Sequence, residues 1–207
     1  MRRAVHWEEV YKHRASDDVS WYRPHLERSL AMVESLGLDS SASIVDIGGG
    51  ASTFVDDLLA RGFSDLTVLD LSESALAIAR ERLGERAAEV RWIAGDATKT
   101  DLGCDRYDVW HDRAVFHFLT DENDRRAYIE HMCCALRTGG HVVLSTFAPD
   151  GPERCSGLPV ARYGADELLG VLGEAYELVE TSRENHETPK GTVQSFTHCL
   201  LYKTISC

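Results

Sequence analysis

The sequence predicts an α/β protein: a doubly wound, mainly parallel sheet of seven strands with an antiparallel last strand, covered by helices on both faces. Up to about residue 147, short apolar runs of strand length alternate with stretches of helical periodicity. Such alternation is typical of a parallel sheet whose crossover helices cover both faces. Two further apolar runs follow, over 176–180 and 195–202, and this terminal pair predicts the antiparallel strand.

Residues 1–40 are expected to be helical. Pro24 suits the first position of a helix, because its missing N–H would have no partner there. Leu26, Leu30 and Val33 recur at helical spacing, and Gly37 can end this helix.

A glycine turn follows the first strand, 44–47. Asp46 lies in that strand, and Gly48, Gly50 and Ser52 lie in the turn. Glycine lets a backbone approach a ligand closely, and nucleotides bind at the carboxyl ends of strands in open α/β sheets. The spacing differs from the dinucleotide fingerprint, and Asp46 would repel a pyrophosphate but suits an ammonium or a sulfonium. A tight connection between strand and helix, without a ligand, is the alternative interpretation.

The second and third strands each lead to an acid. The second strand, 66–69, is followed by Asp70 and Leu71. The third strand, 90–93, leads to Asp96 and Ala97. Asp70 is placed to accept hydrogen bonds from both hydroxyls of a ribose. Asp96 can accept one from an exocyclic amine, such as that of adenine.

Helices are expected between the strands. The helix after the glycine turn ends near Gly62, Ser72 can cap the next one, and Thr120 with the acids after it starts a third. A short helix is expected at about 164–172.

The fourth strand runs into a cluster of ionisable residues. The strand is 107–110, the cluster is His111, Asp112, Arg113 and His117, and a fifth strand follows at 141–145. These side chains stand in an otherwise apolar stretch, which favours a functional site.

Taken together, these motifs resemble the class I S-adenosylmethionine-dependent methyltransferases, of the small cytoplasmic seven-strand type, over roughly residues 40–147. The resemblance implies a Rossmann-like fold and S-adenosyl-L-methionine as cofactor. The residues that it implies for cofactor binding are Asp46, Gly48, Gly50, Ser52, Asp70, Leu71, Asp96, Ala97 and His111.

The same resemblance places the tip of the fourth strand between the methionine end of the cofactor and the methyl acceptor. His111 or His117 could then act as a base, while Arg113 holds an anionic group of the acceptor. The alternative is structural: an ion pair between Asp112 and Arg113, and a hydrogen-bonded His117. The Asn/Asp-Pro-Pro-Tyr/Phe pattern is absent here, which argues against nucleobase and glutamine acceptors.

Aromatic residues near the N-terminus resemble the lid of thiol, tellurite and lysine methyltransferases. Trp21 and Tyr22 are expected to cover the cofactor, since an aromatic ring attracts a sulfonium by about 2 kcal/mol once desolvated. Trp7 is expected only to pack the helices onto the sheet.

The loop at 149–163 is expected to face the acceptor. Cys155, with His186 and Gln194 nearby, could bind a soft metal or metalloid, although an inert loop cysteine is the more ordinary interpretation. No metal site is therefore predicted.

Composition excludes several classes of function. The net charge of −12 argues against a nucleic-acid partner, and no apolar run approaches the roughly 18 residues that span a membrane. The six cysteines form no C-x-x-C pair, so we expect them to be reduced and the protein to be cytoplasmic.

We expect one methyltransferase domain over 1–207, with a helical lid (1–40), a cofactor-binding core (41–147) and a substrate loop with a closing hairpin (148–207). The expected acceptor is a small molecule: a thiol or chalcogen, an amine, or a carboxylate. A protein-lysine methyltransferase, an NAD-dependent oxidoreductase and a non-catalytic cofactor-binding module are the alternatives.

Overall fold

A computed structural model describes residues 2–13 and 18–205. Seven strands form one sheet: β1 (Ser43–Ile47), β2 (Asp65–Asp70), β3 (Val90–Ala94), β4 (Tyr107–Arg113), β5 (Leu136–Phe147), β8 (Tyr176–Glu187) and β9 (Val193–Lys203). Their order is β3-β2-β1-β4-β5-β9-β8. Pairs among the first five strands are parallel, and β9 is antiparallel to both of its neighbours, β5 and β8. The predicted fold class is therefore confirmed.

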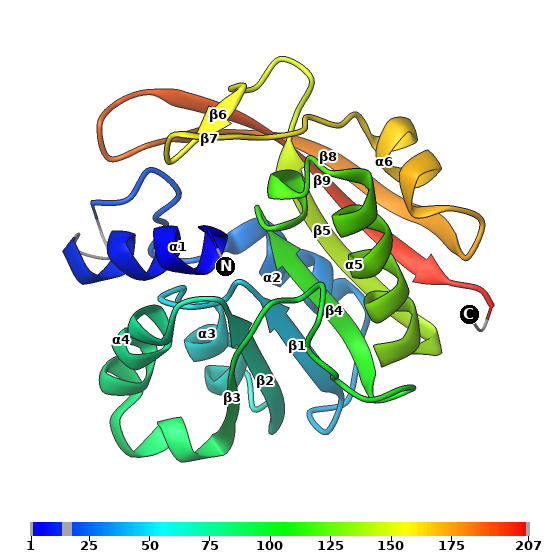
Figure 1. Cartoon of the computed structure of the whole chain (residues 1–207). Helices are drawn as coiled ribbons and strands as arrows, with labels where there is room; N and C mark the ends of the chain where they lie inside the picture. The colour runs from blue at the N-terminus through cyan, green and yellow to red at the C-terminus, as the bar shows by residue number, and fades with distance from the viewer. Residues whose placement is uncertain (1, 14–17, 206–207) are drawn as a thin grey trace.

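Helices cover both faces of the sheet (Figure 1). The helices are α1 (Arg2–His13), α2 (Glu27–Ser35), α3 (Phe54–Ala60), α4 (Glu73–Leu83), α5 (Glu122–Ala135) and α6 (Ala165–Leu172), with short 3-10 turns η1 (Gly84–Glu89) and η2 (Phe116–Phe118). Apolar residues of α2, α3 and α4 form one core cluster with the sheet, and those of α5 and α6 form the other.

Helix starts follow the sequence signals in two cases and differ in one. Ser72 caps α4 as expected, because its hydroxyl accepts a hydrogen bond from Ala75 N at 3.1 Å. Helix α5 begins within the predicted start segment, with Asp121 as its cap. The prediction that Pro24 opens a helix is wrong: α2 begins at Glu27, and the carbonyl of Pro24 instead accepts a hydrogen bond from Thr53 in the glycine turn.

Strands β5 and β8 extend furthest beyond their predicted bounds. Strand β5 begins directly after α5, and β8 continues past residue 180 to pair with the whole length of β9. A small hairpin, β6 (Arg154–Cys155) with β7 (Leu158–Pro159), forms within the 149–163 loop. Its two turn residues, Ser156 and Gly157, both have positive φ angles (48° and 79°), as a two-residue hairpin requires.

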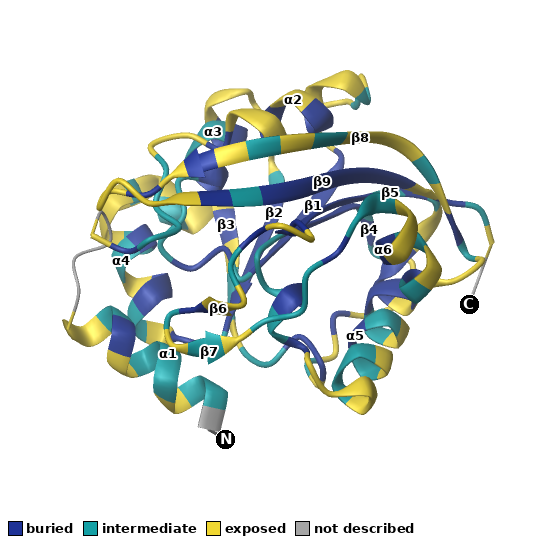
Figure 2. Ribbon diagram, turned by 90° about the horizontal axis from the view of Figure 1, so that it is seen from above, coloured by how far each residue is buried: buried dark blue, intermediate teal, exposed yellow. Residues whose placement is uncertain are grey.

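Strand β9 lies in the interior and β8 forms the edge of the sheet. Figure 2 shows β9 as mostly buried, whereas many residues of β8 are exposed. No helix in the described part of the chain is long and apolar enough to cross a membrane.

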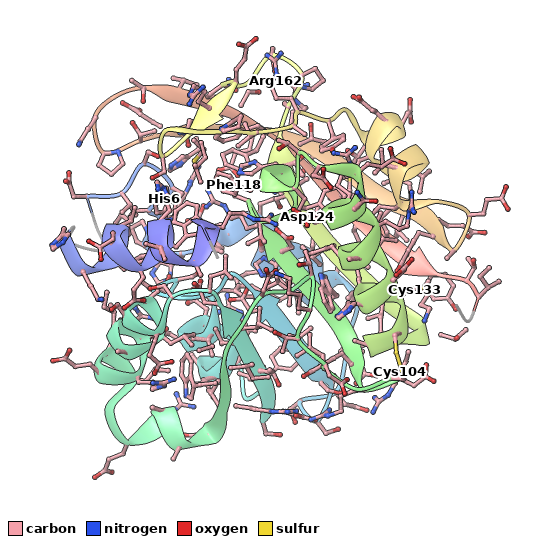
Figure 3. The ribbon with its side chains drawn as sticks, in the orientation of Figure 1. His6, Cys104, Phe118, Asp124, Cys133 and Arg162 are labelled. Atoms are coloured by element: carbon pink, nitrogen blue, oxygen red, sulfur yellow. A yellow bond between two sulfur atoms is a disulfide. The ribbon has the colours of Figure 1, made fainter. Side chains whose placement is uncertain are left out.

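The expectation that all cysteines are reduced is wrong, as a disulfide among the described residues shows. Cys104, in the segment before β4, forms a disulfide with Cys134 of α5, beside the Cys104 label in Figure 3. Cys155 and Cys199 are buried thiols, and Cys207 lies outside the described residues. The pair is 30 residues apart in the chain, so no short motif marks it.

Candidate functional site

A cleft opens at the carboxyl ends of β1, β2, β3 and β4, beneath α1. Its larger cavity holds about 810 Å³ of free space up to the open mouth, and a smaller one of about 530 Å³ adjoins it. Both cavities are lined by Tyr11, Trp21, Ile47, Gly48 and Arg113, so they form one continuous site.

The glycine turn forms the floor of the cleft. A Cβ atom on Gly48 would lie 2.1 Å from the Val115 side chain, and one on Gly50 would lie 2.5 Å from an Asp70 carboxylate oxygen. A Cβ on Gly49, a position that the sequence motif did not single out, would lie 2.3 Å from Asp46. Gly49 and Gly50 therefore make room for two carboxylates. Gly48 lines both cavities and Gly49 the smaller one, whereas Gly50 lines neither.

Asp46 and His111 face each other on neighbouring strands. The register of β1 and β4 pairs the two residues, and the His111 Nδ1 atom lies 2.6 Å from Asp46 Oδ1. The second ring nitrogen, Nε2, lies 2.9 Å from the Ser29 hydroxyl, and the ring stacks on Phe54. Both nitrogens of His111 thus have protein partners, whereas the buried Asp46 Oδ2 has none among the described residues.

Asp70 lies at the tip of β2, in the wall of the larger cavity. Its Oδ1 atom accepts a hydrogen bond from Ser72 N at 2.8 Å. Burial, with the nearby charges of Asp46 and Glu8, raises the pKa of Asp70 to about 7. A buried carboxylate with spare acceptor capacity is suited to a ligand that donates hydrogen bonds.

Asp96, Leu71 and Ala97 complete this side of the larger cavity. Asp96 Oδ1 accepts hydrogen bonds from the backbone and hydroxyl of Thr98 at 3.0 and 2.7 Å. Burial acts to raise the pKa of Asp96, but the bonds from Thr98 and Lys99 outweigh it and lower the pKa. Asp96 is therefore a fixed anion at this position.

Asp112 is enclosed beneath η2 and α5. It accepts hydrogen bonds from Val115 N at 2.8 Å, Phe116 N at 3.0 Å and the Tyr128 hydroxyl at 2.5 Å. Burial raises its pKa to about 6 despite these bonds. Within the described chain Asp112 forms no ion pair with Arg113, so the structural alternative for these two residues does not hold.

Arg113 extends past the end of β4 and lines both cavities. Its Nη1 atom donates to the Trp21 carbonyl at 3.0 Å, and its guanidinium carbon lies 4.8 Å from the centre of the Phe196 ring. No carboxylate of the described residues lies within 4.0 Å of it. Burial lowers its pKa to about 10, so it is a cation at neutral pH.

His117 lies away from the cleft. It is fully buried between the rings of Phe118 and Phe147 and lines neither cavity. Its Nδ1 atom accepts a hydrogen bond from Phe147 N at 3.3 Å. Burial, with the charge of Arg113, lowers its pKa to about 3, so it is neutral.

Helix α1 and the segment after it form the roof of the cleft. Trp7 packs edge to face against Trp21 and Phe118, with ring centres 5.4 and 5.1 Å apart, and the Trp21 indole donates to the Tyr11 hydroxyl at 3.1 Å. Trp7 therefore lines the larger cavity in addition to packing. Tyr22 lines only the smaller cavity, beside Ser52.

Polar contacts fasten α1 on three sides. Glu8 accepts hydrogen bonds from the hydroxyls of Ser72 and Ser74 at 2.8 and 2.6 Å, at the N-terminus of α4. Arg3 pairs with Asp124 of α5 at 2.5 Å. His6 contacts Ser156 of the small hairpin at 3.4 Å. Figure 3 shows His6, Phe118 and Asp124 in a row across the mouth of the cleft.

The structure brings Cys155 to the cleft but does not bring His186 and Gln194 there with it. Cys155 lines the larger cavity, and burial raises its pKa to about 11. His186 and Gln194 line neither cavity, and the His186 Nδ1 atom accepts a hydrogen bond from Arg23. No group of three or more potential metal ligands occurs among the residues that the structure describes.

Comparisons with known proteins point to one class of enzyme. A family model described as a methyltransferase domain matches residues 44–140. EEF1A lysine methyltransferase 2 of Danio rerio is 23% identical, over 84% of this chain and 75% of its own length. Malonyl-[acyl-carrier protein] O-methyltransferase of Paenibacillus sp. (strain JDR-2) is 29% identical, over 82% of this chain and 69% of its own length.

Solved structures share the fold. The N-methyltransferase NodS of Bradyrhizobium japonicum WM9, in complex with S-adenosylhomocysteine, superposes with a TM-score of 0.72 over 95% of this chain and 97% of its own, at 21% identity. A Burkholderia thailandensis 1,6-didemethyltoxoflavin-N1-methyltransferase, also with bound S-adenosylhomocysteine, gives a TM-score of 0.71 over 99% of this chain and 85% of its own, at 22% identity.

Proposed function

The chain belongs to the class I S-adenosylmethionine-dependent methyltransferases, and from this premise we propose that it methylates a small-molecule acceptor in the cleft beneath α1. The observation that carries the proposal is the division of the cleft. Acids line the half at the tips of β1, β2 and β3, whereas aromatic rings and one unpaired arginine line the half beneath α1.

The acidic half fits S-adenosylmethionine. Asp46 Oδ2, which has no hydrogen-bond partner among the described residues, would accept a hydrogen bond from the cofactor's ammonium group. Asp70 would bind the ribose hydroxyls, and Asp96 the adenine amine beside Leu71 and Ala97. Gly48, Gly50 and Ser52 would give the cofactor its close approach, with Trp21 and Tyr22 above its methionine end. When bound, the cofactor supplies an electrophilic methyl group on a sulfonium.

Three residues at the carboxyl end of β4 have different roles in this proposal. His111 orients Asp46 from the floor of the smaller cavity, and Asp112 holds the turn that follows β4. Arg113 is the residue of this group that we assign to the acceptor, because it lines both cavities and has no ion pair. His117 supports the turn as a neutral side chain, which disfavours a role as a base.

A protein lysine is the second candidate acceptor, because relatives named as lysine methyltransferases align with most of this chain. Two features favour a small molecule. The cationic Arg113 would repel a lysine ammonium group, and the roof fastened by Glu8, Arg3 and His6 leaves less room for a protein segment than for a small ligand. A cytoplasmic location stays a prediction, and the disulfide weighs against it because such bonds are rare in reducing compartments.

Calorimetry with S-adenosylhomocysteine and with NAD tests the cofactor. We expect S-adenosylhomocysteine to bind in the micromolar range and NAD to show no saturable binding. Tight binding of NAD without binding of S-adenosylhomocysteine would contradict the proposed function.

A further inference from the structure

The proposed function can be narrowed to a class of acceptor. We propose that the acceptor is a small carboxylic acid with a flat apolar body, that Arg113 binds its carboxylate, and that the product is a methyl ester. This inference rests on the proposed function, and the experiment below separates the failure of one from the failure of the other.

The first observation is that Arg113 is a cation that lacks an anion. A guanidinium has five N–H donors, and only Nη1 has a hydrogen-bond acceptor among the described residues, the Trp21 carbonyl. Its nearest acidic influence is Glu184, which is already paired with Arg23 and lies 3.0 Å from the His198 ring. The planar fork of an arginine matches a carboxylate in two parallel hydrogen bonds. A carboxylate bound beside Arg113 would therefore find N–H donors that the described residues do not use.

The second observation concerns the walls around Arg113. Trp7 packs edge to face against both Trp21 and Phe118, and these three rings line the larger cavity together with Val115 and Leu119. A flat apolar body can pack against this aromatic surface. A long polar or charged chain would lose hydration here without gaining partners.

The third observation is that the described residues of the acceptor half include no base for neutral pH. Burial raises the pKa of Tyr11 and of Tyr128, and raises that of Cys155 to about 11. The described residues that line the larger cavity include no histidine, and their two acids, Asp70 and Asp96, lie on the cofactor side. An ammonium with a pKa of about 10.4, or a thiol with a pKa of about 8.5, would need such a base. A carboxylic acid would not, since it is already ionised.

The step that follows needs no proton transfer. One carboxylate oxygen attacks the methyl carbon of the sulfonium, an oxygen–carbon bond forms, and the carbon–sulfur bond breaks with its electron pair left on sulfur. The anion and the sulfonium become a neutral ester and a neutral sulfide. Arg113 then faces a neutral product, which favours release of the ester.

A matched panel of acceptors tests the proposal on the full chain. Phenylacetic acid, benzylamine and benzyl mercaptan share one ring and one methylene and differ in the nucleophile. Benzoic, indole-3-acetic and hexanoic acids keep the carboxylate and vary the apolar body that carries it. Formation of S-adenosylhomocysteine reports turnover, and mass spectrometry identifies the ester. We expect the acids to exceed the amine and the thiol by at least about tenfold, and methyl phenylacetate to bind more weakly than phenylacetate, because the ester has lost its charge.

Variants of Arg113 identify the group that holds the acid. Arg113→Gln should lower kcat/KM for the best acid by about 100-fold, whereas Arg113→Lys should keep part of it. Arg126→Gln, on the exposed surface of α5, is the matched control and should change neither activity nor stability. Melting temperatures show whether each variant folds, and the comparison of acid with ester needs no variant.

Three outcomes would overturn the proposal. They are preference for the amine or the thiol, no transfer to any acid of the panel, and a loss of S-adenosylhomocysteine affinity in Arg113→Gln as large as its loss of activity. The last would assign Arg113 to the carboxylate of the cofactor. If S-adenosylhomocysteine still binds, each of these outcomes overturns only the carboxylic-acid proposal and leaves the proposed function intact. If S-adenosylhomocysteine does not bind, the proposed function itself is contradicted.

Discussion

At the scale of single residues, the site holds carboxylates that are unfavourable until a ligand arrives. Asp46 and Asp70 are both buried, and Asp46 contributes to the raised pKa of Asp70. Burial without a full set of partners destabilises an ionised group. The cofactor-free fold therefore carries an electrostatic penalty that hydrogen bonds from the cofactor would offset.

Asp70→Asn separates this penalty from function. The pKa of Asp70 is raised from 3.8 to about 7, so the folded chain binds more protons than the unfolded chain between these values and stability falls as pH rises through them. At pH 8 the variant should melt about 2–4 °C higher. Removing an electrostatic penalty of roughly 1 kcal/mol raises the melting temperature of a chain of this size by that amount. Thermal melts of the cofactor-free protein at pH 4 and pH 8 measure the effect, and a variant that melts lower at pH 8 would contradict it.

The same variant should bind the cofactor poorly. Losing a charged partner of the ribose hydroxyls weakens binding by about 1.5–3 kcal/mol, or one to two orders of magnitude. In the unmodified chain S-adenosylhomocysteine affinity should rise with pH up to about 7 and then level off, since the ionised Asp70 is the better acceptor. Calorimetry across pH 5.5–8.5 should show this dependence flattened in Asp70→Asn, and an unchanged affinity would remove Asp70 from the site.

Local patterns predicted the glycine turn and the strand-tip acids, but not the roles of the residues at the carboxyl end of β4. Successive side chains of a strand point to opposite faces, so His111 and Asp112 must differ. Which face holds α2 and which holds α5 depends on the whole topology. The partner of His111 is fixed by the β1–β4 register, over 65 residues of sequence, and no local signal carries that pairing.

At the scale of elements, helix α1 covers the cleft and is held in place by polar contacts. The hydrogen bonds from Ser74 and Ser72 lower the pKa of Glu8 to about 2. A folded pKa below the ordinary value of 4.5 means that the contact stabilises the closed roof above that pH and is lost as pH falls towards about 2. The charge also lies at the N-terminus of α4, where an anion is favourable.

Glu8→Gln should loosen the roof while the sheet stays intact. The amide keeps the size of the side chain but loses the charge and one strong acceptor, so α1 should exchange its amide hydrogens faster. S-adenosylhomocysteine should dissociate several-fold faster, because Trp7 and Tyr11 are carried by the same helix. Hydrogen exchange and stopped-flow release measure both effects.

Glu9→Gln is the matched control, since Glu9 is exposed and contacts only His13 one turn further along α1. Equal behaviour of the two variants would show that Glu8 does not fasten the roof.

At the scale of the whole molecule, the sheet and the disulfide tie distant parts of the chain together. The bond between Cys104 and Cys134 joins the segment before β4 to the end of α5. Sequence spacing could not predict it, because helix α5 and the loop meet only after β4 and β5 have paired. The antiparallel last strand was predictable, since a terminal pair of apolar runs marks it.

Cys104→Ser should lower the free energy of unfolding by about 3.6 kcal/mol in the absence of reductant, the amount expected for closing a loop of this length. Urea titrations of the two proteins measure the difference. Equal stabilities would show that positions 104 and 134 are thiols in the purified protein.

Strand β9 lies next to β5 in the sheet, but it is synthesised later on the ribosome, so β5 must wait for this neighbour. Strand β5 ends at Phe147, whereas β9 begins at Val193, about 46 residues later. At roughly 5–20 residues per second, the outer edge of β5 waits about 2–9 seconds for its partner to be translated. During that interval the nascent chain presents an unpaired strand edge to its neighbours, which is the kind of surface that promotes aggregation. The rate at which residues 148–192 are translated therefore sets how long this strand edge stays unpaired.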